Sequence, residues 1–306
     1  MRRGSPDAPT MRDEAAARPR RGMAGRARLV LALGALVLLA LGTKAWRDTM
    51  ADPVVHRAAV TLPQLAPGTA PVRIALISDI HVAGPDMPPE RLARIVGQVN
   101  ALRPDLVLIA GDLVSDKGTA TRHYPTAQAI APLGGLRPRL ATVVVPGNHD
   151  HWRDMPAIRR ELERRGAVVL ANAARRFGPV TVGGLDDDYT GRADLPATVA
   201  AMRTLGGAPV LLSHSPDPFP DLPRRSALML AGHTHCGQLR FPWIGAPATM
   251  SRYGDRYACG LKRENGNVLV VGAGLGTSLL PFRFGTRPEV WLIELRGPSP
   301  ARDRSR

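Results

Sequence analysis

RIALISDIH, residues 73–81, is a short apolar run that ends in an aspartate and a histidine, two side chains that can bind metals. A helical pattern of apolar residues follows from Pro88 to Leu102, and a second apolar run, residues 106–110, ends in Gly-Asp. Short apolar runs that alternate with an amphipathic helix are typical of the strands and helices of an α/β layered fold. This stretch therefore predicts α/β architecture with polar side chains at the strand ends.

The same order continues along the rest of the chain. Further short strands are predicted at residues 141–145, 168–170, 180–183, 209–212, 228–231, 268–271 and 290–295, and a further helix at residues 157–165. The Pro-rich stretch 52–72 is interpreted as a tether or an edge strand. Residues 52–298 are thus expected to form one folded α/β body, with a basic tail at 299–306.

The composition supports a folded body and does not favour nucleic-acid binding. Apolar residues make up 44% of the 306 residues and aromatic residues only 4%, so we expect a core of Val, Leu, Ile and Ala. The net charge is +15, and eight Arg lie within residues 1–28, a basic end that suits an anionic membrane surface. No recognised nucleic-acid motif accompanies this charge, so nucleic-acid partners are not expected.

An uncharged apolar segment, LVLALGALVLLALGT at residues 29–43, follows the basic N-terminal segment 1–28, in which Met23 is an alternative start. A helix of this length spans about 22 Å, between a signal-peptide apolar region and a full bilayer span of about 30 Å. The sequence after it is a poor cleavage site, and Trp46 suits a membrane interface. We therefore expect an uncleaved transmembrane anchor at 29–46, with a signal segment as the alternative. Basic residues before the anchor would place the body outside, on the periplasmic side.

Five polar segments follow predicted strands directly. They are Asp79-x-His81, Gly111-Asp112, Gly147-Asn148-His149-Asp150, Ser213-His214 and Gly232-His233-Thr234-His235. Because ligands of α/β sheets bind beyond the carboxyl ends of strands, we expect these segments to meet at one place. Imidazole and carboxylate suit Zn, Fe and Mn, and two ions about 3.5–4 Å apart can clamp a phosphoryl group. Each segment alone is explained as a helix cap or a turn, but five together favour a hydrolytic metal site.

Taken in order, the five blocks resemble the calcineurin-like metallophosphoesterase superfamily, whose pattern runs D-x-H, G-D, G-N-H-D/E, H and G-H-x-H. The resemblance covers about residues 72–295. It implies a two-sheet α/β/β/α sandwich, which the repeated strand order also favours. The flanking SDIH, LLSHSPD and AGHTHCGQ are similar to a membrane-associated bacterial branch. That branch includes phosphodiesterases and the UDP-2,3-diacylglucosamine pyrophosphatases of lipid A synthesis.

The resemblance implies two divalent ions, Mn, Fe or Zn, each held by three side chains and joined by one bridging carboxylate. These ligands are, for the first ion, Asp79, His81 and His235, for the second, Asn148, His214 and His233, and as the bridge, Asp112. His149 would stay unligated near the scissile phosphate, as proton donor or charge stabiliser. Asp150 would orient His149, as carboxylates behind such residues do.

Two positions depart from the family pattern. Many members carry a second Asp three residues after the bridging one, but here Ser115 stands there and Asp116 follows, so we expect a shifted supporting contact. Cys236 stands where the branch often has Gly and is expected to be a spectator. It is accompanied by Cys259 alone, which is too few for a disulfide framework. We expect free buried thiols, with one bridge in an oxidising compartment as the alternative.

Several residues lie outside the pattern. Asp186-Asp187-Asp188 is interpreted as a solvated loop, and His151 as a candidate for substrate contact from beside His149. Aromatic side chains gather after the last ligand, where they either pack within the domain or form an apolar platform for a lipid-bearing substrate. They are Phe241, Trp243, Tyr253, Tyr257, Phe282 and Phe284.

The leading hypothesis is hydrolysis of a phosphodiester or pyrophosphate bond at the membrane by a dinuclear metal site and a metal-activated hydroxide. An outward body favours a cell-envelope phosphoester, whereas an inward one would favour UDP-2,3-diacylglucosamine, so this alternative stays open. The rival class is a non-catalytic metal-binding module of the same fold. The complete ligand set and the presence of His149 argue against it. The sequence indicates no oligomeric state.

Overall fold

The computed structural model describes residues 21–225 and 227–299 and divides into two compact units, Met1–Thr43 and Lys44–Arg306. The expected basic segment as far as residue 20 and the basic tail from residue 300 lie outside the described residues. Helix α1 (Arg21–Met50) supplies the described part of the first unit, and its last residues, from Lys44, belong to the second. Its part Gly25–Met50 is long and apolar enough to cross a membrane. The helix therefore extends well beyond the apolar run 29–43, because its flanks continue the same helical turns.

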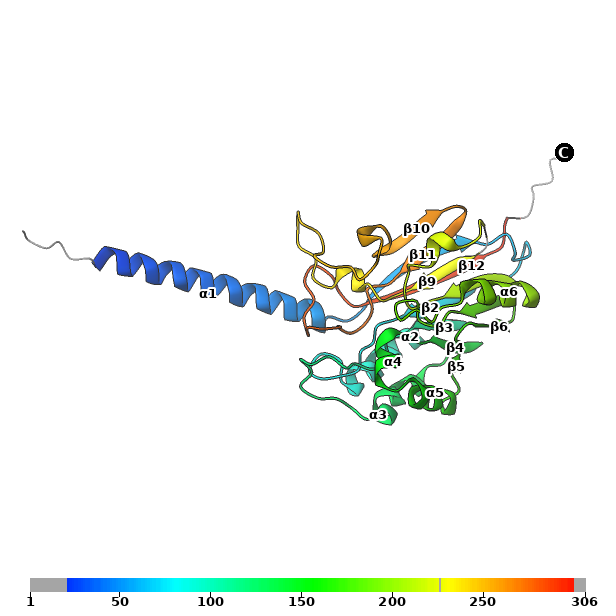
Figure 1. The fold of residues 1–306 in the computed structure, drawn as a ribbon, viewed down its shortest axis with the longest axis horizontal. Helices are drawn as coiled ribbons and strands as arrows, with labels where there is room; N and C mark the ends of the chain where they lie inside the picture. Colours follow the sequence, from blue (N-terminus) through cyan, green and yellow to red (C-terminus); the bar gives the residue numbers. More distant parts are fainter. Residues whose placement is uncertain (1–20, 226, 300–306) are drawn as a thin grey trace, which may run out of the picture. The chain divides into compact units, whose positions relative to one another are not determined.

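The second unit is built on two mixed sheets with helices on their outer faces, as the sequence predicted (Figure 1). The first sheet has the order β1 (Val54–Thr61), β12 (Glu289–Arg296), β2 (Val72–Ile77), β3 (Leu106–Ala110), β4 (Ala141–Val145) and β5 (Val168–Val169). Only its β12–β2 pair is antiparallel. Residues 52–72 thus contain a full strand, β1, which pairs with β12 at the sheet edge.

The second sheet has the order β10 (Gly260–Glu264), β11 (Asn267–Val271), β9 (Leu228–Ala231), β8 (Ala208–Leu212), β7 (Val180–Gly184) and β6 (Ala173–Phe177). Its central strands are parallel, and the outer pairs β10–β11 and β6–β7 are antiparallel. Strands β2, β3 and β4 of the first sheet and β8 and β9 of the second end at one edge of the sandwich, which is where polar residues follow them in the sequence.

Alternation along the strands divides the apolar residues among three cores. Ile74 and Leu76 of β2 pack between the sheets with Val210 of β8, in the largest buried cluster. The intervening Ala75 and Ile77 face the opposite way, against α2 (Pro89–Ala101), α3 (Thr126–Ile130) and α5 (Met155–Arg164). The outer face of the second sheet packs against α6 (Leu195–Leu205) and short 3-10 turns. The buried stripe of α2 contains Leu92, Ile95, Val96 and Val99, as its periodicity predicted.

Several elements were absent from the sequence prediction. Strands β6 and β10 lie at sheet edges and carry Arg and Lys, so their apolar alternation is weak. Helix α6 is rich in small residues and is preceded by Asp194, whose carboxylate accepts from the Ala197 N–H. Helix α4 (Asn148–Arg153) begins inside a ligand segment, where its polar residues look like a turn.

Candidate metal centre

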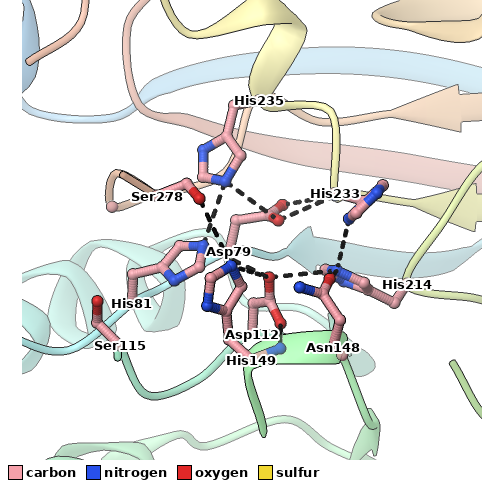
Figure 2. Close-up of polar contacts among 12 residues, drawn as sticks. Asp79, His81, Asp112, Ser115, Asn148, His149, His214, His233, His235 and Ser278 are labelled. Carbon is pink, nitrogen blue, oxygen red and sulfur yellow. Dashed lines mark hydrogen bonds and ion pairs between the residues drawn. The ribbon is translucent and has the colours of Figure 1, made fainter. Parts of the chain in front are cut away.

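The carboxyl ends of β2, β3, β4, β8 and β9 bring the five polar segments to one place (Figure 2). Their donor atoms form three overlapping groups, in each of which the atoms lie within 4.8 Å of one another. These groups are Asp79, His81 and His235; His81, Asp112 and His149; and Asp112, His214 and His233. All of these side chains are buried, and Asn148 is buried beside them. The predicted convergence is therefore present.

The first cluster contains two imidazole rings that face one carboxylate. The Nε2 atoms of His81 and His235 are 3.2 Å apart, and His235 Nε2 is 3.5 Å from Asp79 Oδ1. Burial lowers the pKa of both imidazoles well below the usual value, so both rings are neutral. Within residues 21–225 and 227–299, the Nδ1 atom of each ring is buried with no hydrogen-bond partner. Neutral imidazoles beside a carboxylate form a donor set that suits a transition-metal cation.

The second cluster has its tautomers set by backbone carbonyls. His214 Nδ1 donates to the carbonyl of Ala110 over 2.8 Å, so in the neutral ring its Nε2 carries a lone pair. His233 Nε2 donates to the carbonyl of Met250 over 3.1 Å, which leaves a lone pair on its Nδ1. These two nitrogens are 3.0 Å apart, and Asn148 Oδ1 lies 3.0 Å from His214 Nε2. With His214 neutral, three acceptor atoms face one another with no proton among them, an arrangement that fits a cation.

Asp112 lies between the clusters. Its Oδ2 is 3.2 Å from His214 Nε2 and 3.5 Å from His81 Nε2, while its Oδ1 accepts from the His149 N–H over 2.9 Å. Burial raises the pKa of the Asp112 carboxyl, but His214 and the neighbouring imidazoles outweigh burial and hold that pKa well below its usual range. The carboxylate is therefore ionised and reaches both clusters.

The centre carries two buried carboxylates that form no ion pair with a lysine or arginine among the described residues. Burial raises the pKa of Asp79 to about 6, so at neutral pH this carboxylate also stays ionised. In the described part of the chain, the ion pairs of Asp79 and Asp112 involve only histidines. Burial lowers the pKa of His214, but Asp112 and Asp79 outweigh it and raise that pKa well above the usual value. The same field that attracts a proton there favours a bound cation, since unpaired buried charge is costly.

The backbone at these ligands is held in an unusual conformation. Five of the predicted ligands have positive φ, namely Asp79 (48°), His81 (49°), Asp112 (55°), His233 (70°) and His235 (50°). Non-glycine residues in this region cost about 1–3 kcal/mol each and persist where the surroundings enforce them. Gly147 lets the two ligand turns approach closely, because a Cβ there would overlap the Asp112 carboxylate. Strand-end turns thus aim the ligands inward at the cost of backbone strain.

His149 is positioned by Asp116, and the expected contact with Asp150 is corrected. The Nδ1 atom of His149 hydrogen-bonds the Asp116 carboxylate, which is the shifted supporting contact anticipated beside Ser115. On the other side of the ring, His149 Nε2 lies 3.5 Å from Ser278 Oγ and 4.0 Å from Asp112 Oδ2 (Figure 2).

Asp150 has a different role because both of its oxygens accept from backbone. Its Oδ2 accepts from the N–H groups of Asp112 (2.8 Å) and Gly147 (3.0 Å), and its Oδ1 from that of Leu113 (2.8 Å). Burial raises the pKa of Asp150 to about 7. This carboxylate therefore ties the β3 and β4 ligand turns together and leaves His149 to Asp116.

Two aromatic side chains that the sequence did not single out stand at the edge of the centre. The ring of Trp152 lies 4.8 Å from that of His149, and the ring of Tyr189 lies 4.9 Å from that of His233. The two rings also meet each other edge to face at 6.2 Å, and both are half-exposed. Trp152 stands three residues after His149 on α4, a spacing that could have indicated it, whereas Tyr189 has no sequence signal.

The acidic loop before Tyr189 is more ordered than expected. Asp186 Oδ1 lies 2.7 Å from His151 Nε2, Asp187 is fully buried and accepts from the Thr190 N–H, and Asp188 pairs with Arg252. The prediction of a solvated loop is therefore wrong, because these carboxylates bind the loop itself and its neighbours. The ring of His151 is held by Asp186, and its contact with substrate stays a prediction.

The prediction of free cysteines is wrong. Cys236 and Cys259 form a disulfide, because the turn after His235 and the segment before β10 meet.

The aromatic side chains that follow the last ligand in the sequence fall into a buried and an exposed group. Tyr257 is buried and packs against Phe219, whereas Trp243 and Phe282 are exposed.

The sequence of this chain is similar to those of several known proteins. A family model described as calcineurin-like phosphoesterase matches residues 72–237. The chain is 33% identical to a transmembrane protein with metallophosphoesterase domain from Danio rerio, over 74% of this chain and 53% of that protein. It is 30% identical to phosphodiesterase YaeI of Escherichia coli (74% and 83%) and 29% identical to the uncharacterized metallophosphoesterase YkuE of Bacillus subtilis (73% and 79%). The chain thus spans about half the length of the Danio rerio relative.

Proposed function

Since the chain belongs to the calcineurin-like phosphoesterase family, we propose that it hydrolyses a phosphodiester or pyrophosphate bond with two divalent ions while anchored in a membrane. Membership of the family supports the class of enzyme, a metal-dependent hydrolase. The number of ions, the substrate and the membrane site are the proposed parts. The observation that carries the proposal is the Asp112 carboxylate, which reaches two separate clusters of metal-capable atoms.

In this proposal each cluster holds one ion. The ligands are Asp79, His81 and His235 for one ion, Asn148, His214 and His233 for the other, and Asp112 for both. Divalent cations at such sites neutralise phosphoryl oxygens and lower the pKa of a water molecule. The chain supplies the fixed geometry, since Asp150 and the strained turns hold the ligands before any substrate arrives.

His149 is proposed to act on the leaving group. Asp116 accepts from its Nδ1–H, which leaves Nε2 facing the space between Asp112 and Ser278. From there the ring, when Nε2 also carries a proton, can give that proton to the departing oxygen, and Ser278 can donate a hydrogen bond to the same group. A non-catalytic module would need none of these contacts. The complete ligand set together with an oriented His149 therefore favours catalysis.

We also propose that α1 anchors the protein and that the catalytic unit faces the outer, periplasmic side. The apolar helix and the transmembrane name of the Danio rerio relative support anchoring. Basic residues before the helix support an outward body, and the disulfide is of the kind that persists in oxidising compartments. The substrate would then be a cell-envelope phosphoester, lipid-linked or near the membrane. No observation in the described residues favours UDP-2,3-diacylglucosamine over other phosphoesters.

A substrate panel tests this proposal. Purified full chain should hydrolyse bis(p-nitrophenyl) phosphate and a phospholipid diester with added Mn²⁺, lose this activity with a chelator, and bind two metal equivalents. Hydrolysis that survives complete metal removal would contradict the metal mechanism. Protease treatment of intact spheroplasts should cleave the catalytic unit, and protection of that unit would contradict the outward orientation.

A further inference from the structure

Two loops beside the metal centre carry large apolar side chains that face solvent. The first is the loop 239–250, and the second is the loop 277–285. Trp243 is fully exposed, at 101% of its reference area, and the others are exposed to a large extent: Ile244 (76%), Leu279 (69%), Leu280 (45%), Phe282 (40%) and Phe241 (36%). We call these six side chains the apolar rim. A contiguous exposed patch of this kind marks an interaction surface in a soluble domain.

The two loops lie against each other, so the rim is one surface. The Arg240 N–H donates to the Phe284 carbonyl over 2.7 Å, and the Phe284 N–H donates to the Gln238 carbonyl over 3.0 Å. The Gln238 amide donates to the carbonyls of Leu280 (3.0 Å) and Phe282 (2.9 Å). The rings of Phe241 and Phe284 are 5.2 Å apart. Hydrogen bonds from backbone and from the Gln238 side chain therefore join the two loops.

The rim is presented on a fixed base. The disulfide between Cys236 and Cys259 closes the segment that carries Trp243. Within that segment the backbones of Phe241 and Gly245 exchange two hydrogen bonds, of 2.9 and 3.1 Å, which makes a tight hairpin tip. The exposed Trp and Ile thus project from a closed turn, and folding does not bury them.

The rim adjoins the point where the chain continues into the apolar segment 29–43. The Trp46 ring meets the Phe282 ring at 6.3 Å, and the Lys44 ammonium lies 4.9 Å from the centre of the Phe284 ring. The Arg283 N–H donates to Thr49 Oγ1 over 2.6 Å. Residues 44–50 and the loop 277–285 are therefore packed together within the same compact unit. Trp and Lys at the end of an apolar segment are residues that occupy a membrane interface.

The rim also borders the metal centre. Leu279 directly follows Ser278, whose hydroxyl lies 3.5 Å from His149 Nε2. Met250, which ends the loop 239–250 and is half-exposed, accepts from His233 Nε2 through its carbonyl. Both loops therefore run from exposed apolar side chains at one end to contacts with site histidines at the other.

We propose that the apolar rim inserts into the headgroup–acyl boundary of the bilayer that holds α1, so that the metal centre takes phosphoesters of acyl lipids at headgroup level. The inference rests on the anchoring and hydrolysis proposed above and adds the docking surface and the substrate class. Lipid is the occupant because the rim continues the surface formed by Trp46 and Lys44 at the end of the apolar segment. The phosphate of a lipid would then reach the centre past Leu279 and Ser278, while its acyl chains stay in the membrane.

Tryptophan fluorescence of the full chain tests the docking. The protein is reconstituted into phosphatidylcholine–phosphatidylglycerol vesicles with or without bromine on the upper acyl carbons. Because an interfacial side chain lies about 5–10 Å into this boundary, the emission assigned to Trp243, as wild type minus Trp243→Phe, should fall about twofold in brominated vesicles. Trp291→Phe is the matched control, because Trp291 is buried in β12 and its emission should not respond. Trp243 emission that bromine leaves unchanged would overturn the proposal and point to a protein partner.

A second measurement addresses the substrate class. Two double variants, Trp243→Ser with Ile244→Ser and Leu279→Ser with Leu280→Ser, should raise the apparent KM for a vesicle-borne phospholipid diester about tenfold, in line with lost interfacial binding. Turnover of bis(p-nitrophenyl) phosphate should stay at the wild-type level in the variant of Trp243 and Ile244. Leu205→Ser, an exposed apolar side chain at the end of α6, is the control and should change neither. Equal effects on both substrates would refute the role of the rim in lipid access. If the wild-type protein hydrolysed neither substrate, the proposed function would be refuted, and the bromine experiment alone would test the docking.

Discussion

The metal centre buries charged side chains and the apolar rim exposes apolar ones, so the two regions reverse the usual distribution of side chains in opposite ways. Among the described residues, the centre buries two carboxylates, Asp79 and Asp112, whose ion pairs involve histidines but no lysine or arginine. The rim exposes Trp243 and Ile244 to a large extent. Most exposed apolar residues and most paired polar ones need no explanation, but these two inversions do. In the proposals above, a component outside the chain resolves each inversion: a cation at the centre and a lipid surface at the rim. The predictions below weaken one region at a time.

The largest expected effect comes from removing the charge shared by the two clusters. Asp112→Asn should lower kcat/KM by about 10³-fold, because charge stabilisation of several kcal/mol is lost and each 1.4 kcal/mol is tenfold. Asn148→Ala, which removes a neutral ligand of one ion, should cost less. Turnover of bis(p-nitrophenyl) phosphate and metal content measured on the same samples would show this order.

The control for Asp112→Asn is Asp255→Asn, an exposed carboxylate that pairs with Arg240 and should leave turnover unchanged. Retention of two ions with a near-normal rate in Asp112→Asn would show that this carboxylate is not a bridge.

A smaller effect is expected where a side chain serves the leaving group and holds no ion. His149→Ala should keep its metal and lose about 10²-fold in rate on an alkyl phosphodiester, because proton transfer to an alkoxide is lost. Nitrophenolate departs without a proton, so on a nitrophenyl ester the loss should be about tenfold or less. Loss of an ion would make His149 a ligand, and equal losses on both esters would make it a binding residue.

The sequence predicted the centre better than it predicted the rim, and the reason is physical. Ligand chemistry depends on residue type at a strand end. The apolar runs before Asp79, Asp112 and His214 were therefore enough to predict that these residues lie close together. The supporting contacts depend on how turns close, and for that reason the partner of His149 was misassigned to Asp150 instead of Asp116. Strands β6 and β10 escaped prediction for a similar reason, since edge strands lack clear alternation.

Exposure is a property of the folded surface, so the sequence could not separate the exposed aromatics from the buried ones. Tyr257 and Trp243 occur in one aromatic cluster of the sequence, yet one is buried and the other fully exposed. The disulfide could not be predicted for the same reason, because Cys236 and Cys259 are 23 residues apart and meet only through tertiary structure.

The corrected contacts of His149 give a third prediction. Asp116→Asn should lower turnover about tenfold, since loss of an orienting partner typically costs 10–100-fold, while leaving thermal unfolding unchanged. Asp150→Asn should do the reverse, lowering the free energy of unfolding by about 1–3 kcal/mol because buried backbone N–H groups lose acceptors. Calorimetry and steady-state kinetics on both variants distinguish the two roles. An Asp150→Asn protein of full stability with impaired proton transfer would restore the original assignment.

The smallest effect on catalysis is expected from deleting the proposed anchor, provided that residues 44–50, which pack beside the rim, are kept. Deletion of residues 1–43 leaves the compact unit intact and should not change turnover of a water-soluble ester. Deletion of residues 1–50 also removes Thr49, whose carbonyl accepts from the buried Arg91 (2.7 Å) and whose hydroxyl accepts from the Arg283 N–H. Unsatisfied buried donors cost about 1–3 kcal/mol each, so the shorter protein should unfold at a lower temperature. Equal unfolding temperatures would mean that residues 44–50 belong to the anchor alone. A lower temperature only after the longer deletion would show that the end of α1 is part of the catalytic unit, beside the rim.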